Sequence, residues 1–390
     1  MSTPITKAFE NFSNEYLKHN SATIEQHKVI DCILACKTGK LGYNIQACED
    51  CGTIHSHYNS CGNRHCPNCQ AINKDKWVFS KQNDVIPVRY HHTVFTVPAE
   101  IRTLFKFNKK RLYNLIFKCA WETIDDFSAN PKNKIEAKMG MIAILHTWKQ
   151  DMEYHPHLHC IVPSGGITAN NKWKSSPSKG NYLFNVEALA KTFKGKMLFY
   201  LKQYQKNKLL VYWNLNNQRP SEYFYNLKED LYAKDWVVYS KESFENSNSV
   251  FEYLGRYTHK IAISNYRIKE VTDTHVSFEY TDRADNYKKK IRTVEGTEFI
   301  KLFLQHVLPK RFMKIRSYGF LSSRNKTGAL TNLHDYFNLG KYEKPVKLNS
   351  IEVLELVYKI KPGVCNVCGG NLIVVESKSR HQARASPRAA

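Results

Sequence analysis

The spacing of hydrophobic and polar residues changes along this chain, and each change predicts a different element. From Ala8 to Cys36 the apolar residues recur at helical spacing, which predicts helix. Val88–Pro98 is rich in β-branched and aromatic residues and ends at a proline, as expected for a strand. Helical spacing returns from Ile101 to Phe127, and Met141–Trp148 then predicts a second strand.

A third strand is predicted at His155–Pro163, after a short turn at Asp151–Glu153. The short turn predicts that the second and third strands form a hairpin. Further helices are predicted at Asn185–Tyr204 and Val250–Thr258, followed by a strand at Ile261–Ser264.

Composition narrows the class of protein. The 390 residues are sufficient for two or three domains with proper cores. A formal net charge of +23 and 13% aromatic residues predict a nucleic acid partner, because cations bind phosphates and rings stack on unpaired bases. No segment approaches the ~20 apolar residues of a spanning helix, and Met1–Phe12 lacks the apolar core of a signal peptide. We therefore expect a cytoplasmic location.

Basic residues are concentrated between positions 285 and 326, a stretch that we interpret as a DNA-contacting face. A solvated basic surface without a ligand is the alternative interpretation. The residues expected to bind DNA here are Lys288, Lys289, Lys290, Lys310 and Arg311. The Ala/Arg/Ser-rich end of the chain, from Arg380 to Ala390, is expected to be disordered.

Cysteines cluster near the beginning of the chain at the spacing of zinc ligands. Cys48 and Cys51 form one C-x2-C pair, and Cys66 and Cys69 form a second. Two such knuckles at this separation predict a structural Zn²⁺ site with four thiolate ligands. Cys61 and His65 are possible further ligands, since a Cys/His pair can replace one knuckle sulfur.

A third C-x2-C pair, Cys365 and Cys368, lies far from the others in sequence and needs partners to form a metal site. Cys32 with Cys36, or Cys61 with His65, would complete a second zinc site and tie the two ends of the chain together. A zinc-free turn is the alternative.

Histidines alternate along the third predicted strand, so that their side chains share one face. His157 and His159 are the primary candidates for a catalytic divalent ion, Mg²⁺ or Mn²⁺. His146 on the neighbouring strand can reach the same face and is the expected third ligand. His155 lies beside a proline at the start of the strand and ranks fourth. The similar pattern at 55–57 lies within the zinc module and is discounted.

Tyr253 and Tyr257 are one helical turn apart, on the same predicted helix face. A phenolate can attack a phosphodiester and conserve the bond as phosphotyrosine. The spacing alone is weak support, since the chain has 23 tyrosines and Tyr200 and Tyr204 have the same relation. Arg256 and Lys260 distinguish the first pair, because they can bind the strand that is cut.

Taken together, these motifs resemble the two-tyrosine, HUH-type (His-hydrophobic-His) rolling-circle transposases of bacterial insertion sequences. The matching segments are Asn59–Gln70, Val94–Pro98, Leu145–Trp148, His155–Cys160, Tyr253–Asn265, Phe299–Leu304, His306–Pro309 and Ile315–Gly319. The resemblance implies an α+β fold with an antiparallel nuclease sheet and helices on its outer side, preceded by a small zinc-ribbon-like domain. It also implies cleavage of single-stranded DNA through a 5′-phosphotyrosine intermediate, one strand at a time, by a protein associated with the nucleoid when bound to DNA.

We expect three regions: a helical and zinc-binding domain at 1–80, the endonuclease and strand-transferase domain at 84–326, and a C-terminal extension at 327–390. Three other functions remain open at this point. A plasmid replication initiator or mobilisation relaxase would use the same chemistry. A non-catalytic zinc-ribbon DNA-binding protein would leave the histidines and tyrosines unused, whereas a metallohydrolase using activated water would release products free of protein.

Overall fold

The computed structural model describes residues 3–177, 183–213, 218–244, 250, 255, 261–282 and 284–380, with the backbone alone at 242–244. In this part of the chain the strands form three sheets in which the paired strands run antiparallel. The protein is therefore α+β, as expected. No helix among the described residues has the length and apolar character needed to span a bilayer.

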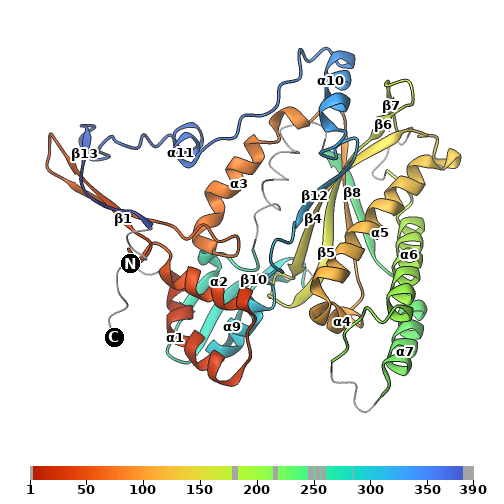
Figure 1. Ribbon diagram of the computed structural model, residues 1–390, viewed down its shortest axis with the longest axis horizontal. Helices are drawn as coiled ribbons and strands as arrows, with labels where there is room; N and C mark the ends of the chain where they lie inside the picture. The colour runs from red at the N-terminus through yellow and green to blue at the C-terminus, as the bar shows by residue number, and fades with distance from the viewer. Residues whose placement is uncertain are drawn as a thin grey trace.

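The largest sheet has seven strands in the order β7-β6-β4-β5-β3-β8, with β12 paired to β4. Its strands are β3 (Tyr90–Thr96), β4 (Lys138–Trp148), β5 (Tyr154–Pro163), β6 (Gly165–Ile167), β7 (Trp173–Ser175), β8 (Val238–Phe244) and β12 (Ile315–Gly319). Strands β4 and β5 form the predicted hairpin at the centre of the sheet (Figure 1).

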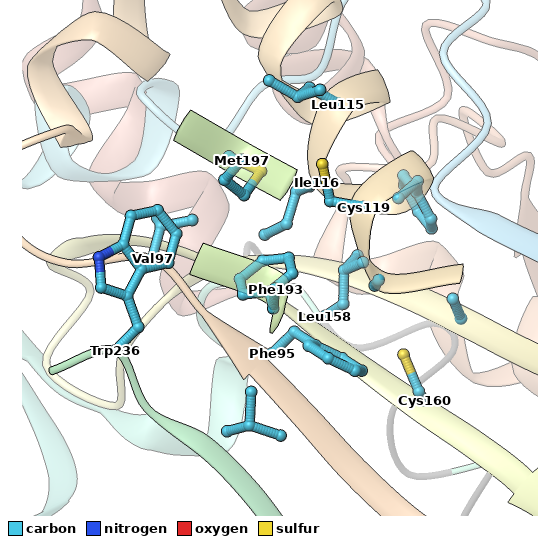
Figure 2. Packing of buried hydrophobic residues seen from close by; sticks show 14 of the residues in the cluster. Phe95, Val97, Leu115, Ile116, Cys119, Leu158, Cys160, Phe193, Met197 and Trp236 are labelled. Atoms are coloured by element: carbon cyan, nitrogen blue, oxygen red, sulfur yellow. The ribbon is translucent and has the colours of Figure 1, made fainter. Parts of the chain in front are cut away.

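Helices cover one face of this sheet. The long helices α5 (Lys109–Ala129) and α6 (Val186–Lys206) pack on it, and α7 (Pro220–Ala233) lies beside α6 (Figure 1). Phe95 and Leu158 of the sheet meet Phe193 of α6 in a continuous apolar core (Figure 2). The rings of Phe95 and Phe193 are 5.0 Å apart. Burial of such large side chains is the main force that holds the helices on the sheet.

The helix predicted from Ile101 to Phe127 is in fact two helices, α4 (Arg102–Phe107) and α5, separated at Asn108. The buried Asn108 side chain donates to Leu104 O at 3.0 Å and to Val211 O at 2.7 Å, and accepts from Val211 N at 2.9 Å. These bonds satisfy the side-chain amide where the helix is interrupted.

A second core joins the two halves of the chain. Helices α1 (Pro4–His19) and α2 (Ile24–Ala35) pack against α9 (Gly296–Leu304) and a three-stranded sheet. The sheet consists of β9 (Ile268–Val271), β10 (His275–Asp282) and β11 (Lys288–Glu295). Phe9 contacts Phe303 edge-on, with ring centroids 5.2 Å apart. The N-terminal helices therefore share their core with residues 262–307.

The strand expected at Ile261–Ser264 is not formed. Ala262 and Ile263 are buried in the second core without a sheet partner among the described residues. The Arg267 guanidinium donates to Ala262 O at 3.3 Å and to Glu279 O at 2.8 Å. A side chain, rather than a neighbouring strand, thus bonds the backbone of this segment.

The C-terminal segment returns to the N-terminal region. After α10 (Lys326–Tyr336) the chain runs past α3 (Gln70–Phe79), where α11 (Ser350–Tyr358) packs, and then forms β13 (Leu372–Lys378) (Figure 1). Strand β13 pairs with β1 (Tyr43–Cys48), which pairs in turn with β2 (Ile54–Tyr58).

Candidate metal centres and catalytic site

Three histidines meet on the face of the large sheet opposite α5 and α6. The register of β4 and β5 pairs His146 with His157 and Ile144 with His159, so the three imidazoles project from the same face. Their ligand atoms lie within 4.8 Å of one another. The Nε2 atoms of His157 and His159 are 3.1 Å apart. The structure therefore brings together the three histidines that were predicted as ligands.

Hydrogen bonds orient two of these rings. His157 Nδ1 lies 2.7 Å from the His155 carbonyl oxygen, to which only a protonated nitrogen can donate, so the neutral tautomer that makes this bond has its lone pair on Nε2. His159 Nδ1 lies 2.9 Å from His92 Nε2. When His159 donates in that bond, its own Nε2 is also left as an acceptor facing His157. Neutral imidazoles held in this manner are the ligands that a divalent transition metal or Zn²⁺ uses in proteins.

His155, ranked fourth from the sequence, is not part of the three-histidine group. It contributes its carbonyl, which orients His157. His92 was not identified from the sequence. It lies on β3, where Val94 is opposite His159, and two residues along a strand return to the same face. The strand itself was predicted, but its register with β5 was not.

His306 and Trp148 fix the end of β4 that carries His146. His306 Nε2 donates to Met152 O at 2.9 Å, and its Nδ1 lies 3.1 Å from Thr147 Oγ1. Burial lowers the pKa of His306 to about 3, so the ring is neutral. Trp148 stacks on His146 with ring centroids 4.6 Å apart. The strand end that carries His146 is thereby fixed by aromatic and polar contacts.

Beside His306 lies a small pocket rich in basic groups, lined by the half-buried Arg64, His65 and Lys314, with Trp148 and His306 among others. His65 Nε2 accepts from the Leu308 amide at 3.3 Å, and burial holds its pKa well below the usual value. Burial, with Arg64 nearby, lowers the pKa of Lys314 to about 7. His65 is thus a packing residue here, outside both cysteine groups.

The tyrosine segment falls largely outside the described residues: Tyr253, Tyr257, Arg256 and Lys260 all do so. Two residues of the segment are described. Val250 is fully buried in a cluster with Ile144 and Ile161, which lie on the histidine face of β4 and β5. Gly255 lies against α3, where a Cβ atom would be 3.2 Å from Val78 Cγ2.

The cysteines form two separate groups of four. The first consists of Cys36, Cys61, Cys66 and Cys69, all buried. Cys69 Sγ lies 3.6 Å from the sulfurs of both Cys36 and Cys61. Zn–S bonds of about 2.3 Å place the sulfurs of a tetrahedral site roughly 3.8 Å apart. This group therefore has the dimensions of a four-thiolate zinc site.

The second group consists of Cys48, Cys51, Cys365 and Cys368. The set predicted from the sequence, Cys48 and Cys51 with Cys66 and Cys69, is thus divided between two groups. The reason is the β1–β2 hairpin, whose turn carries Cys48 and Cys51 away from the buried pair. The partners proposed for Cys365 and Cys368 also differ, because Cys36 and Cys61 belong to the first group and Cys32 to neither.

The predicted DNA-binding cations differ in their surroundings. Lys288, Lys289 and Lys290 lie on β11, where carboxylates of Asp285, Glu279 and Asp282 pair with them at 2.9 to 3.3 Å. Lys310 and Arg311 are exposed in the turn before β12. The second pair presents charge to solvent, whereas part of the first set is offset by acidic neighbours.

The fold and these groups define a zinc-binding α+β protein with a histidine centre. Family models place it further: one described as "Putative transposase" matches residues 140–327, and one described as "Transposase zinc-binding domain" matches residues 8–97. The putative transposase y4qJ of Sinorhizobium fredii is 34% identical, over 86% of this chain and 84% of its own. The transposase for insertion sequence element IS801 of Pseudomonas savastanoi pv. phaseolicola is 26% identical, over 87% and 81%.

The chain belongs to this family, the transposases of bacterial insertion sequences that carry a zinc-binding domain at the N-terminus. The resemblance inferred from the sequence motifs is confirmed. No solved structure matches the chain.

Proposed function

We propose that this transposase nicks and rejoins single-stranded DNA at the ends of its insertion sequence, through a 5′-phosphotyrosine intermediate. His146, His157 and His159 would hold the catalytic Mg²⁺ or Mn²⁺. The observation that carries the proposal is the convergence of these three imidazoles, with His157 Nε2 and His159 Nε2 3.1 Å apart. When bound, the divalent ion would polarise a non-bridging phosphate oxygen and so make the phosphorus easier to attack.

The tyrosines would supply the nucleophile. The phenolate oxygen of Tyr253 or Tyr257 attacks phosphorus, a new P–O bond forms, and the bond to the 3′ oxygen breaks. That oxygen leaves with the electron pair and takes up a proton, which gives a free 3′-hydroxyl and a 5′-phosphotyrosine. One phosphoester replaces another, so attack by a 3′-hydroxyl reverses the step without ATP. Two tyrosines permit a second transfer while the first link is held.

Two described neighbours support this role for the tyrosine segment. Gly255 approaches Val78 of α3. Val250 is buried in one cluster with Ile144 and Ile161, which lie on the same sheet face as the histidines. Val250, the first residue of the predicted helix, therefore lies on the histidine side of the sheet.

The proposed partner is single-stranded DNA, and its binding would draw on the net charge of +23. Lys310 and Arg311 would contact phosphates directly because they are exposed. Arg256 and Lys260 would bind the strand beside the nucleophiles. A basic protein of this kind would associate with the nucleoid in the bacterial cytoplasm.

The test is a denaturing gel of the purified protein mixed with single-stranded oligonucleotides from the ends of its element, with Mg²⁺ or Mn²⁺. We expect an adduct that survives denaturation and requires the metal. Tyr253→Phe combined with Tyr257→Phe should abolish the adduct and retain DNA binding. Tyr200→Phe with Tyr204→Phe is the matched control, because this pair has the same spacing on α6; it should leave the adduct intact. Cleavage without any attached protein would contradict the tyrosine mechanism and favour activated water.

A further inference from the structure

Two knuckles with the same sequence pattern and backbone geometry lie at opposite ends of the chain. Both read C-x2-C-G: Cys48 to Gly52 and Cys365 to Gly369. In the first, the Gly52 amide donates to Cys48 O at 3.0 Å, and in the second the Gly369 amide donates to Cys365 O at 2.9 Å. The two glycines have φ of +67° and +82°, a conformation that favours glycine. Each knuckle is thus a tight turn that presents two sulfurs on one side.

The two knuckles face each other. Cys48 Sγ lies 3.4 Å from Cys368 Sγ, and Cys51 Sγ lies 3.8 Å from Cys365 Sγ. These distances are near the edge of a tetrahedral four-thiolate zinc site, about 3.8 Å, and far above the ~2.05 Å of a disulfide bond. The four cysteines are free thiols, so the arrangement fits a metal rather than a pair of cross-links.

Further donors surround the sulfurs. The Val367 amide donates to Cys365 Sγ at 3.5 Å, and the Gly370 amide donates to Cys368 Sγ at 3.4 Å. His55 Nε2 lies 3.3 Å from Cys365 Sγ. Four thiolates around one Zn²⁺ leave a net negative charge, which N–H donors of this kind stabilise. His55, discounted as a catalytic ligand, therefore has a supporting position in this group.

A sheet aligns the knuckles. Strand β13 pairs with β1 from Tyr43 opposite Lys378 to Cys48 opposite Leu372. The Glu49 amide extends the ladder with a bond to Asn371 O at 3.0 Å. The three strands form a ribbon in the order β13-β1-β2. Strand β13 is more than 300 residues away from the other two in sequence.

The C-terminal segment has little apolar core of its own. Among residues 350–380, only Val353 and Cys365 are buried, whereas Ile373, Val374 and Val375 of β13 are 49%, 58% and 61% exposed. A segment of this length buries too little apolar surface to offset its conformational entropy. Metal binding is the usual source of stability for such small ribbons.

We propose that Cys48, Cys51, Cys365 and Cys368 bind a second structural Zn²⁺ and close a zinc ribbon built from both ends of the chain. Cys365 and Cys368 lie outside both family matches, which end at residues 97 and 327. The first group, Cys36 to Cys69, lies wholly within the zinc-binding domain match. The second ion therefore has a different role: it fastens the C-terminal segment to the N-terminal domain.

The test is the zinc content of the full chain, measured by mass spectrometry of the metal after gel filtration. All proteins carry His157→Ala and His159→Ala, so that zinc at the histidine centre is not counted. We expect two zinc ions per chain in this parent and one after Cys365→Ser with Cys368→Ser. Val367→Ser, between the two ligands, is the matched control and should retain two.

Hydrogen exchange provides a second readout on the same proteins. Loss of the second ion should increase exchange in β13 and leave β4 and β5 unchanged, because the large sheet has its own core. One zinc ion in the parent, or two in the Cys365/Cys368 variant, would overturn the proposal. Neither result bears on the tyrosine chemistry, so the two proposals fail independently.

Discussion

His92 is the residue through which the position of His159 can be tested. Its Nε2 lies 2.9 Å from His159 Nδ1, and the two rings stack with centroids 5.1 Å apart. Removal of a partner that orients a metal-binding histidine typically lowers metal affinity by about 10- to 100-fold. We therefore expect His92→Ala to reduce adduct formation at low Mn²⁺. Adduct formation should recover at high Mn²⁺, and DNA affinity should be unchanged. A loss that added metal does not restore would identify His92 as a folding residue instead.

The lowered pKa of Lys314 predicts that the stability of the folded chain depends on pH. Burial lowers the pKa of Lys314 in the folded chain to about 7, and that of Lys109 to about 8, from an ordinary value of 10.5. Between pH 7 and 10.5 the unfolded chain therefore binds more protons than the folded chain, and the free energy of unfolding rises with pH.

Urea denaturation of the zinc-loaded protein at pH 7 and pH 9 checks this effect. Between the two pH values the wild-type chain should gain roughly 2 kcal/mol more than Lys314→Met. Lys314→Met should be more stable at pH 7 and should gain less, since the buried ammonium is gone. An equal gain in both proteins would show that other groups cause the pH dependence.

At the residue scale, the sequence predicted that the three histidines meet on one face, because strand periodicity brings alternate side chains to the same side. His157 and His159 needed only this local rule, and His146 needed a short hairpin. His92 and His306 required the register of distant segments, β3 against β5 and residues 303–308 against β4. No local pattern contains that information.

At the scale of elements, Gly319 ends β12 where this strand meets β4. Its φ is +62°, and a Cβ atom there would lie 1.7 Å from the Met139 carbonyl oxygen. Gly319→Ala should therefore shift one strand against the other and cost roughly 2–4 kcal/mol of stability. Gly328, in α10, has open space around its Cα. Gly328→Ala should stabilise the protein by about 0.5–1 kcal/mol, and thermal unfolding of both variants measures the contrast.

Strands β3, β4 and β5 of the large sheet were predicted because each has a strong periodic pattern, whereas the short β6 and β7 and the strands β8 and β12 were not predicted. Two predictions that were wrong have identifiable causes. Asn108 divides one predicted helix because its side chain bonds Val211, far along the chain. Residues 261–264 have strand composition, yet Arg267 bonds the backbone at Ala262. In both segments a tertiary contact overrides the local preference.

For the whole molecule, the pairing of the cysteine knuckles could not be predicted. Each C-x2-C pair can be recognised in the sequence as half of a metal site. Any two pairs are chemically compatible, however, and their separation in sequence favours pairing of those that are close along the chain. The fold selects distant partners because β13 returns to β1. Likewise, the shared core of α1 and α9 joins the regions 1–80 and 84–326, which were predicted to be separate domains. Long-range pairing of this kind depends on the complete topology.

The charge of the whole molecule leads to a prediction about salt. Each phosphate neutralised on single-stranded DNA contributes about 0.7 to the slope of log affinity against log salt. Lys310 and Arg311 are exposed, so Lys310→Gln with Arg311→Asn should reduce the steepness of this slope by about 1.4. Asparagine suits position 311, where φ is +57°.

Lys288 and Lys290 provide the comparison, because Asp282 and Asp285 pair with them at 2.9 to 3.2 Å. Cations already neutralised by carboxylates release fewer counterions on binding, so Lys288→Gln with Lys290→Gln should change the slope less. Fluorescence anisotropy of a labelled oligonucleotide over a range of salt concentrations measures both. A larger change from the β11 pair would mean that DNA displaces the aspartates, and would place the main DNA contact on β11 instead of the turn before β12.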